Sequence, residues 1–161
     1  MKIVVKLTAI LAIALVKLIS FGGVLPAEAI TQNFQVDGDR GYRMETIFSY
    51  DQDQQQKAIS EQGANAKVLN SLKVRFYAPD GEMIANYDNI VDGIIQSNYF
   101  EFNYDLETQQ LRGKVDLGGE SPGEMYLKGD VEQGLSLIRV EPSGEERVID
   151  QVSSRDREIG R

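Results

Sequence analysis

The stretch Tyr99-Phe100-Glu101-Phe102-Asn103-Tyr104 and the run from Leu111 to Leu117 decide the fold of this chain. Phe100, Phe102 and Tyr104 recur with a period of two, which places their side chains on one face of a β-strand. The second run alternates in the same way, with Leu111, Gly113, Val115 and Leu117 on one face and Arg112, Lys114 and Asp116 on the other. One apolar and one polar face is typical of an antiparallel sheet that is wetted on one side, so the two runs predict a central β-hairpin.

Shorter alternating runs follow one another along the rest of the chain. We expect strands over residues 30–36, 42–50, 71–77, 83–87, 125–131, 135–140 and 147–152. Turn residues such as Pro79-Asp80-Gly81 separate these runs, and no helix of three turns is indicated. About eight or nine short strands, mostly connected by hairpins, predict an all-β antiparallel sandwich or barrel.

Two segments interrupt the alternation. The segment Asp51–Lys67 opens with a polar stretch of low complexity, and we expect a solvated loop there with one helical turn from Gln54 to Ile59. A loop of this length in a compact domain is either mobile or functional. The segment Asp88–Gly93 is rich in turn residues and is interpreted as a connection that leads to the central hairpin.

The N-terminal segment has the pattern of a secretory signal peptide. Lys2 and Lys6 precede an apolar run from Leu7 to Val16, and Ala27-Glu28-Ala29 provides a small-x-small cleavage site, with cleavage expected after Ala29. The alternative is an uncleaved membrane anchor over residues 3–25, although Lys17 interrupts that run. No cysteine follows the apolar run, so a lipid-modified N-terminus is excluded.

The predicted organisation is a signal peptide over residues 1–29, an antiparallel β domain over residues 30–152 and a charged flexible tail over residues 153–161. We expect the domain to be exported to the periplasm or beyond, with no membrane span after cleavage.

Charge and composition narrow the chemistry. The chain of 161 residues has a net charge of −8; its first 29 residues carry three lysines and one glutamate, which leaves −10 on the remainder. Such an acidic domain is a poor partner for nucleic acid or for anionic lipid headgroups, and its charge keeps an exported domain soluble. The chain has no histidine and no cysteine, which excludes disulfides, the usual zinc sites and Ser-His or Cys-His nucleophiles.

Calcium is the first of three weak chemical signals. Asp51-Gln52-Asp53 resembles the start of an EF-hand loop, but Gln56 and Gln62 stand where the loop needs Gly and Glu. Asp37-Gly38-Asp39 and the pair Asp88 and Asp92 offer oxygen ligands for an irregular site. Asp and Gly are also the ordinary residues of turns, and we prefer that interpretation, so no metal ligand is assigned.

The other two signals concern catalysis. Glu101 and Asp116, on facing strands, are the best candidates for the paired carboxylates of a glycoside hydrolase, and Ser71 and Lys73 share one strand face as in a Lys-activated serine. A solvated sheet face explains both pairs more simply, because no tryptophan is present to stack a sugar and no oxyanion-binding device accompanies the serine. No catalytic or cofactor-binding residue is assigned, and we do not expect an enzyme.

A family resemblance accompanies these patterns. Phe48-Ser49-Tyr50-Asp51, the run from Val74 to Gly81 and the run from Phe100 to Gly113 resemble segments of small exported, β-rich bacterial proteins of the cyanobacterial type, whose function is unassigned. The likeness extends over residues 42–140. The same rhythm resembles exported proteins with a C-terminal Pro-Glu-Pro sorting tail, although nothing after Val152 matches that motif. The resemblance implies an exported β domain and assigns no functional residue.

Three functions from different classes remain open. The leading hypothesis is a non-enzymatic binding or structural module of the cell envelope, which engages an unknown protein or envelope component through a sheet face or the Asp51–Lys67 segment. The alternative is a carrier that holds a small apolar ligand inside a barrel lined by some of the seven tyrosines and six phenylalanines. A carboxylate-based hydrolase is the third. A carrier requires an open apolar cavity, a module a filled core, and a hydrolase two acids that converge in a cleft.

Overall fold

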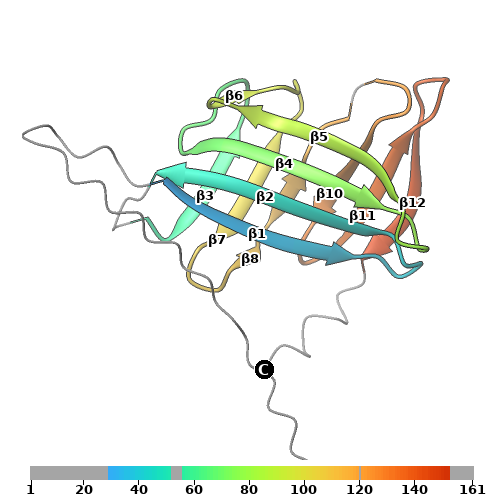
Figure 1. Cartoon of the computed structure of the whole chain (residues 1–161), viewed down its shortest axis with the longest axis horizontal. Helices are drawn as coiled ribbons and strands as arrows, with labels where there is room; N and C mark the ends of the chain where they lie inside the picture. Colours follow the sequence, from blue (N-terminus) through green and yellow to red (C-terminus); the bar gives the residue numbers. More distant parts are fainter. Residues whose placement is uncertain (1–28, 52–55, 120, 153–161) are drawn as a thin grey trace, which may run out of the picture.

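The computed structural model describes residues 29–51, 56–119 and 121–152, and every regular element in these ranges is a β-strand. Twelve strands form two antiparallel sheets that pack face to face (Figure 1). The predicted all-β antiparallel fold is therefore confirmed, and the architecture is a sandwich. The described residues include no helix with the length and apolar character that a membrane span requires.

Sheet A has five strands and forms the front layer in Figure 1. In spatial order these strands are β1 (Ala29–Asp37), β2 (Arg43–Asp51), β4 (Leu69–Tyr77), β5 (Met83–Val91) and β6 (Ile94–Ile95). β1 is one edge of this sheet, and the two-residue β6 is the other.

Sheet B has seven strands. Its spatial order is β12 (Glu146–Val152), β11 (Gly134–Val140), β10 (Met125–Asp130), β9 (Lys114–Asp116), β7 (Glu101–Asp105) and β3 (Ala58–Gln62), with β8 (Gln110–Leu111) paired to β7. Apart from β3, the strands of both sheets follow one another in chain order. The chain is therefore a meander from which one strand, β3, leaves sheet A to become an edge of sheet B.

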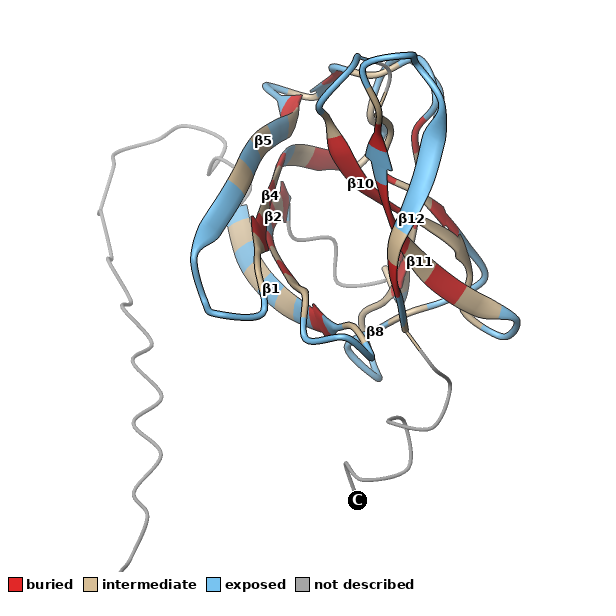
Figure 2. Cartoon of the chain, turned by 90° about the vertical axis from the view of Figure 1, so that its right-hand side faces the viewer, coloured by how far each residue is buried: buried red, intermediate tan, exposed pale blue. Residues whose placement is uncertain are grey.

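Aromatic side chains fill the space between the sheets. The ring of Phe48 in β2 lies 5.0 Å from that of Tyr104 and 5.5 Å from that of Phe102, both in β7, between centroids. Phe34 of β1 packs on the same two rings, at 6.1 and 5.6 Å. Each such pair contributes about 0.5–1.5 kcal/mol beyond the burial of its area. Figure 2 shows the sheets curving around this common interior.

The alternation in the sequence identifies the inward faces correctly. Fully buried side chains recur at every second position of the predicted strands: Met44 and Phe48; Leu72, Val74 and Phe76; Phe100, Phe102 and Tyr104. The predicted central hairpin is present, with Tyr104 opposite Leu111 and Glu101 opposite Asp116. Its second arm is interrupted at Gly113, where φ is +56°, and therefore forms two short strands, β8 and β9, in place of one.

The expected loop over Asp51–Lys67 is wrong. β3 occupies its centre, pairs antiparallel with β7, and buries Ile59 and Glu61 completely. The expected helical turn is wrong at Ala58 and Ile59, which belong to β3, while Gln54 lies outside the described residues. An acidic residue at a core position conceals the alternation of this strand.

The connection predicted over Asp88–Gly93 is also shorter than expected. β5 continues to Val91, and the turn consists of Asp92 and Gly93, both with positive φ. The predicted signal peptide, except Ala29 in β1, and the predicted tail over residues 153–161 lie outside the described residues.

Two buried carboxylates tie the sheets together. Glu61 of β3 is completely buried, and its carboxylate accepts the backbone N–H groups of Lys67, Val68 and Leu69 at 2.7, 2.6 and 3.0 Å. These residues lead into β4 of sheet A. Glu61 therefore attaches an edge strand of sheet B to the start of a central strand of sheet A.

Asp150 of β12 does the same at the opposite edge of sheet B. It is 1 % exposed, and its carboxylate accepts the backbone N–H groups of Arg40 at 2.9 Å and Tyr42 at 3.1 Å, which belong to the β1–β2 turn of sheet A. Gly38 lies against this carboxylate so closely that a Cβ atom there would collide with it. The turn and the aspartate therefore fit only with glycine at this position.

We predict that Asp150→Asn and Glu61→Gln each lower the free energy of unfolding by about 2–4 kcal/mol, because the amide turns a donor toward backbone donors and removes the charge that strengthens these hydrogen bonds. Urea denaturation measures the change. Asp92→Asn and Glu145→Gln, at exposed positions, are the matched controls and should stay within about 0.5 kcal/mol of the parent. A loss equal to that of the controls would show that the carboxylates do not hold the sheets.

Candidate functional site

The two predicted acids lie directly opposite each other, but not in a cleft. Glu101 of β7 pairs with Asp116 of β9. Their neighbours Phe102 and Val115 point into the core, so both carboxylates lie on the outer face of sheet B. Neither acid lines the three hollows of about 250, 270 and 450 Å³ in the described part of the chain. The geometry lacks the sugar cleft that a pair of glycosidase carboxylates requires.

A lysine joins Asp116 to a further acid on this face. The Nζ atom of Lys128 lies 3.7 Å from Oδ2 of Asp116 and 3.3 Å from Oε1 of Glu146. Burial raises the pKa of Asp116, although the backbone N–H of Gly118 and Lys128 act against the shift. Burial also raises the pKa of the neighbouring Tyr126 phenol. These residues form a partly buried polar cluster of the sheet surface.

The serine–lysine pair is divided between two other interactions. The Oγ atom of Ser71 is hydrogen-bonded to Oγ of Ser49 at 2.6 Å, and Nζ of Lys73 forms an ion pair with Asp88 at 3.0 Å. A lysine held by a carboxylate is a poor base for a serine hydroxyl. Both pairs belong to the outer face of sheet A.

The candidate calcium ligands also have separate roles. Asp37 accepts a hydrogen bond from Gln35, Asp51 accepts one from Asn70, and Asp88 pairs with Lys73, each at 2.8–3.0 Å. Within residues 29–51, 56–119 and 121–152, no three acidic side chains converge as a metal site requires. Asp53 lies outside the described residues.

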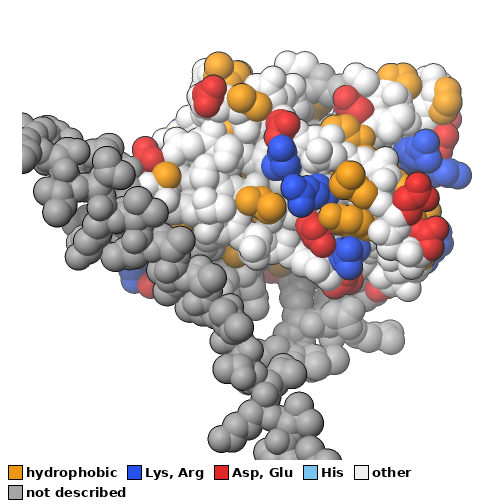
Figure 3. All heavy atoms as spheres, viewed as in Figure 1, with side chains coloured by type: hydrophobic (Ala, Val, Ile, Leu, Met, Phe, Trp, Pro, Cys, Tyr) orange, Lys and Arg blue, Asp and Glu red, His pale blue; other side chains and the backbone are white. Residues whose placement is uncertain are grey.

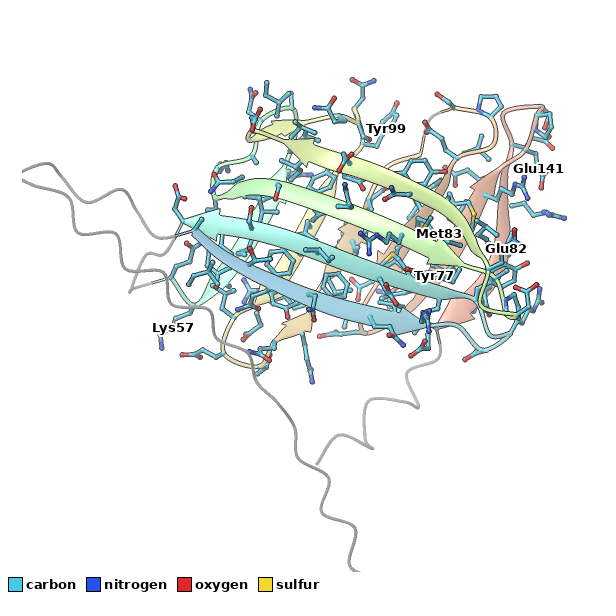
Figure 4. The ribbon with its side chains drawn as sticks, in the orientation of Figure 1. Lys57, Tyr77, Glu82, Met83, Tyr99 and Glu141 are labelled. Atoms are coloured by element: carbon cyan, nitrogen blue, oxygen red, sulfur yellow. The ribbon has the colours of Figure 1, made fainter. Side chains whose placement is uncertain are left out.

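The sequence did not predict a hollow at one end of the sandwich, which we call the end groove. It has a volume of about 450 Å³ and lies between the β4–β5 hairpin and strands β11 and β12. Its lining combines apolar side chains with two arginines and one acid: Tyr42, Ala78, Glu82, Met83, Ile84, Gly123, Met125, Arg139, Arg147 and Ile149. Figure 3 shows hydrophobic and charged side chains side by side over the right half of sheet A, and Figure 4 places Tyr77, Glu82 and Met83 at that end of β4 and β5.

Two β-bulges shape the walls of the end groove. Between β4 and β5 the register shifts so that Phe76 faces Ala85 and Tyr77 faces Met83, which leaves Ile84 as the extra residue. Between β11 and β12 a similar shift leaves Ile149 without a partner. A bulge bends its strand and redirects a side chain. Met83 and Ile84 are accordingly 54 % and 41 % exposed, which is unusual for large apolar side chains in neighbouring positions.

The lining of the end groove includes two arginines and one acid, Glu82. Arg139 of β11 lies directly opposite Arg147 of β12. Arg147 is bound to Glu141 at 2.6 Å, whereas the guanidinium of Arg139 has no ion pair or hydrogen bond among the described residues. Like charges placed directly opposite destabilise an antiparallel pair by a few tenths to about 1 kcal/mol. The sequence contains one indication of this site: Arg139 lies two residues after Leu137 and is therefore in phase with Leu135 and Leu137, whose side chains point into the core.

We predict that Asp116→Asn raises the free energy of unfolding at pH 7, because burial disfavours the charged carboxylate and the amide oxygen still accepts the Gly118 N–H at 3.0 Å. A raised pKa means that the native state retains a proton that the unfolded state has lost. The gain should therefore vanish below about pH 3, where both states are protonated. Urea denaturation at both pH values measures it, with Asp92→Asn as the exposed control. A loss at pH 7 would mean that the attraction of Lys128 outweighs burial.

Comparison with known proteins adds no relative. No protein-family model, no curated protein and no solved structure matches the chain significantly.

Proposed function

We propose that this chain is an exported, non-enzymatic binding module of the cell envelope, and that its end groove binds a partner with an anionic group next to an apolar one. The opposed Arg139 and Arg147 are the observation that carries this proposal. Glu141 already pairs with Arg147, so an anion of the partner would pair with Arg139, whose guanidinium has no ion pair among the described residues. Arginine is well suited to bind carboxylate in a bidentate manner.

The apolar floor beside the arginines supports an amphipathic partner. Tyr42, Met125 and Ile149 line the groove, and the exposed side chains of Met83 and Ile84 form its rim. Apolar burial contributes about 25 cal/mol for each Å² removed from water, and charge complementarity orients the partner. The chain has a net charge of −8, so this local pair of arginines distinguishes the end groove electrostatically from the rest of the surface.

The filled core favours a module over a carrier with an internal ligand. The aromatic rings of Phe48, Phe102 and Tyr104 occupy the space between the sheets and are at most 1 % exposed. The carrier remains a second candidate for one reason: a groove of about 450 Å³ has the size of a small-molecule site. In that case the ligand would be a small anionic amphiphile bound at the end of the sandwich.

Anilinonaphthalene sulfonate, which combines an aromatic body with one anionic group, is a direct probe of the end groove. We predict saturable binding at a single site, detected as a rise in fluorescence, and an affinity about tenfold lower in Arg139→Gln because one charge-assisted interaction is lost. Backbone amide shifts in NMR spectra should be largest around Ile84, Met125 and Ile149.

Arg75→Gln, on the outer face of sheet A, is the matched control and should bind the probe as the parent does. Equal affinity of Arg139→Gln and the parent, or shifts that map elsewhere, would contradict the proposal. Native mass spectrometry of the protein from its source separates the two candidates. An added mass of a few hundred daltons, absent in Arg139→Gln, identifies a carrier, whereas the bare mass is expected for a partner-binding module.

A further inference from the structure

Five strands pair on one side only, and all of them but β1 are protected against further pairing. β6 and β8 are only two residues long, and β5, which β6 covers only at Ile90 and Val91, has two bulges in its pairing with β4. β3 has five residues, and the segment after it is bridged to sheet A through Asn65 and Ile94. β12 carries the charged residues Glu146 and Arg147, and a bulge disturbs its pairing with β11. Short length, charge and bulges are the ordinary devices that prevent edge-to-edge association.

β1 has none of these devices. It is nine residues long, and its pairing with β2 runs without a bulge from Ala29 to Asp37. It contains no proline, glycine or lysine, and Asp37 at its end is its only charged residue. Among the described residues it pairs with no strand other than β2, so its outer side offers a regular row of backbone donors and acceptors (Figure 1, lowest strand of the front sheet).

The core is also incomplete along β1. Ile30, Gln32 and Phe34 point inward but are only half-buried, whereas the rings that Phe34 contacts, Phe102 and Tyr104, are completely covered. An inward side chain of an edge strand gains cover only from a further strand beside it. Another strand on β1 would therefore satisfy the backbone groups and complete the burial of these side chains.

We propose that β1 pairs with β1 of a second copy of this chain, antiparallel and centred on Asn33, to join two sheets A into one continuous sheet across a twofold axis. In this register Ile30 lies opposite Val36 of the second copy, and Gln32 lies opposite Phe34, all on the core face. Asn33 faces its own counterpart on the outer face. A twofold interface requires such self-complementarity.

The charge distribution favours a second copy as the occupant. Most surfaces of an acidic chain would bring carboxylates together when two copies meet, because the net charge is −8. Centred on Asn33, the register places Asp37 at the far end of the strand in each copy, so the two aspartates stay at opposite ends of the interface. The middle of the outer face, Thr31, Asn33 and Gln35, is uncharged. This inference does not depend on the end groove.

Sedimentation velocity over a concentration series tests the proposal. The sample is the purified protein in the form in which it accumulates in the cell. The parent should show a monomer–dimer equilibrium, which Asn33→Lys should weaken by up to about fivefold because two lysines meet across the twofold axis. Asn33→Glu should weaken it equally, and an equimolar mixture of the two variants should restore the dimer.

Gln151→Lys, on the edge strand β12, is the matched control and should dimerise as the parent does. Asn33 is exposed, so circular dichroism and the unfolding midpoint of both Asn33 variants should match the parent. A parent that stays monomeric at every concentration would overturn the proposal, as would a dimer that Asn33→Lys does not weaken. If the mixture of variants fails to dimerise, the proposed register is wrong.

Discussion

Two buried carboxylates hold the two sheets of this protein together. Glu61 and Asp150 lie on the two edge strands of sheet B, and each accepts backbone N–H groups from segments that begin or connect strands of sheet A. The protein has no disulfides, and buried backbone groups must have hydrogen-bond partners. The sandwich therefore depends on these two contacts at the edges of its sheets. The aromatic core supplies the attraction between the sheets, and the carboxylates determine where their ends meet.

The Asp150 contact also positions the end groove. Its carboxylate holds the N–H of Tyr42, whose side chain lines the groove, and the residue before it, Ile149, is the extra residue of the β11–β12 bulge. One wall of the groove is therefore attached to the β1–β2 turn, and this turn cannot move without leaving the buried Asp150 carboxylate without its hydrogen-bond donors. A recognition surface on such a rigid support loses little conformational entropy on binding.

The sequence predicts most of the fold because aromatic and aliphatic residues alternate cleanly in β2, β4 and β7. The sequence-based prediction fails at β3, where Glu61 occupies a core position. A carboxylate at this position indicates a solvated loop, because the sequence does not show that backbone N–H groups six to eight residues later bind it. The sequence correctly predicts that Glu101 and Asp116 face each other, because both residues belong to one hairpin and their pairing is local. The end groove depends on residues from distant segments of the chain and on two bulges. Periodicity places Arg139 in the inward phase of its strand, but it does not indicate which segments meet there or where the bulges lie.

The separation of the Asp150 contact along the chain has a kinetic consequence. The hairpins of both sheets join near neighbours, whereas Asp150 binds residues 108 and 110 positions earlier. Contacts between distant residues close loops of high entropic cost and form late in folding. The N–H groups of Arg40 and Tyr42 cannot bond to Asp150 until β12 has been synthesised and has paired. During synthesis the sandwich therefore remains open at this corner, and the last residues of the domain complete it.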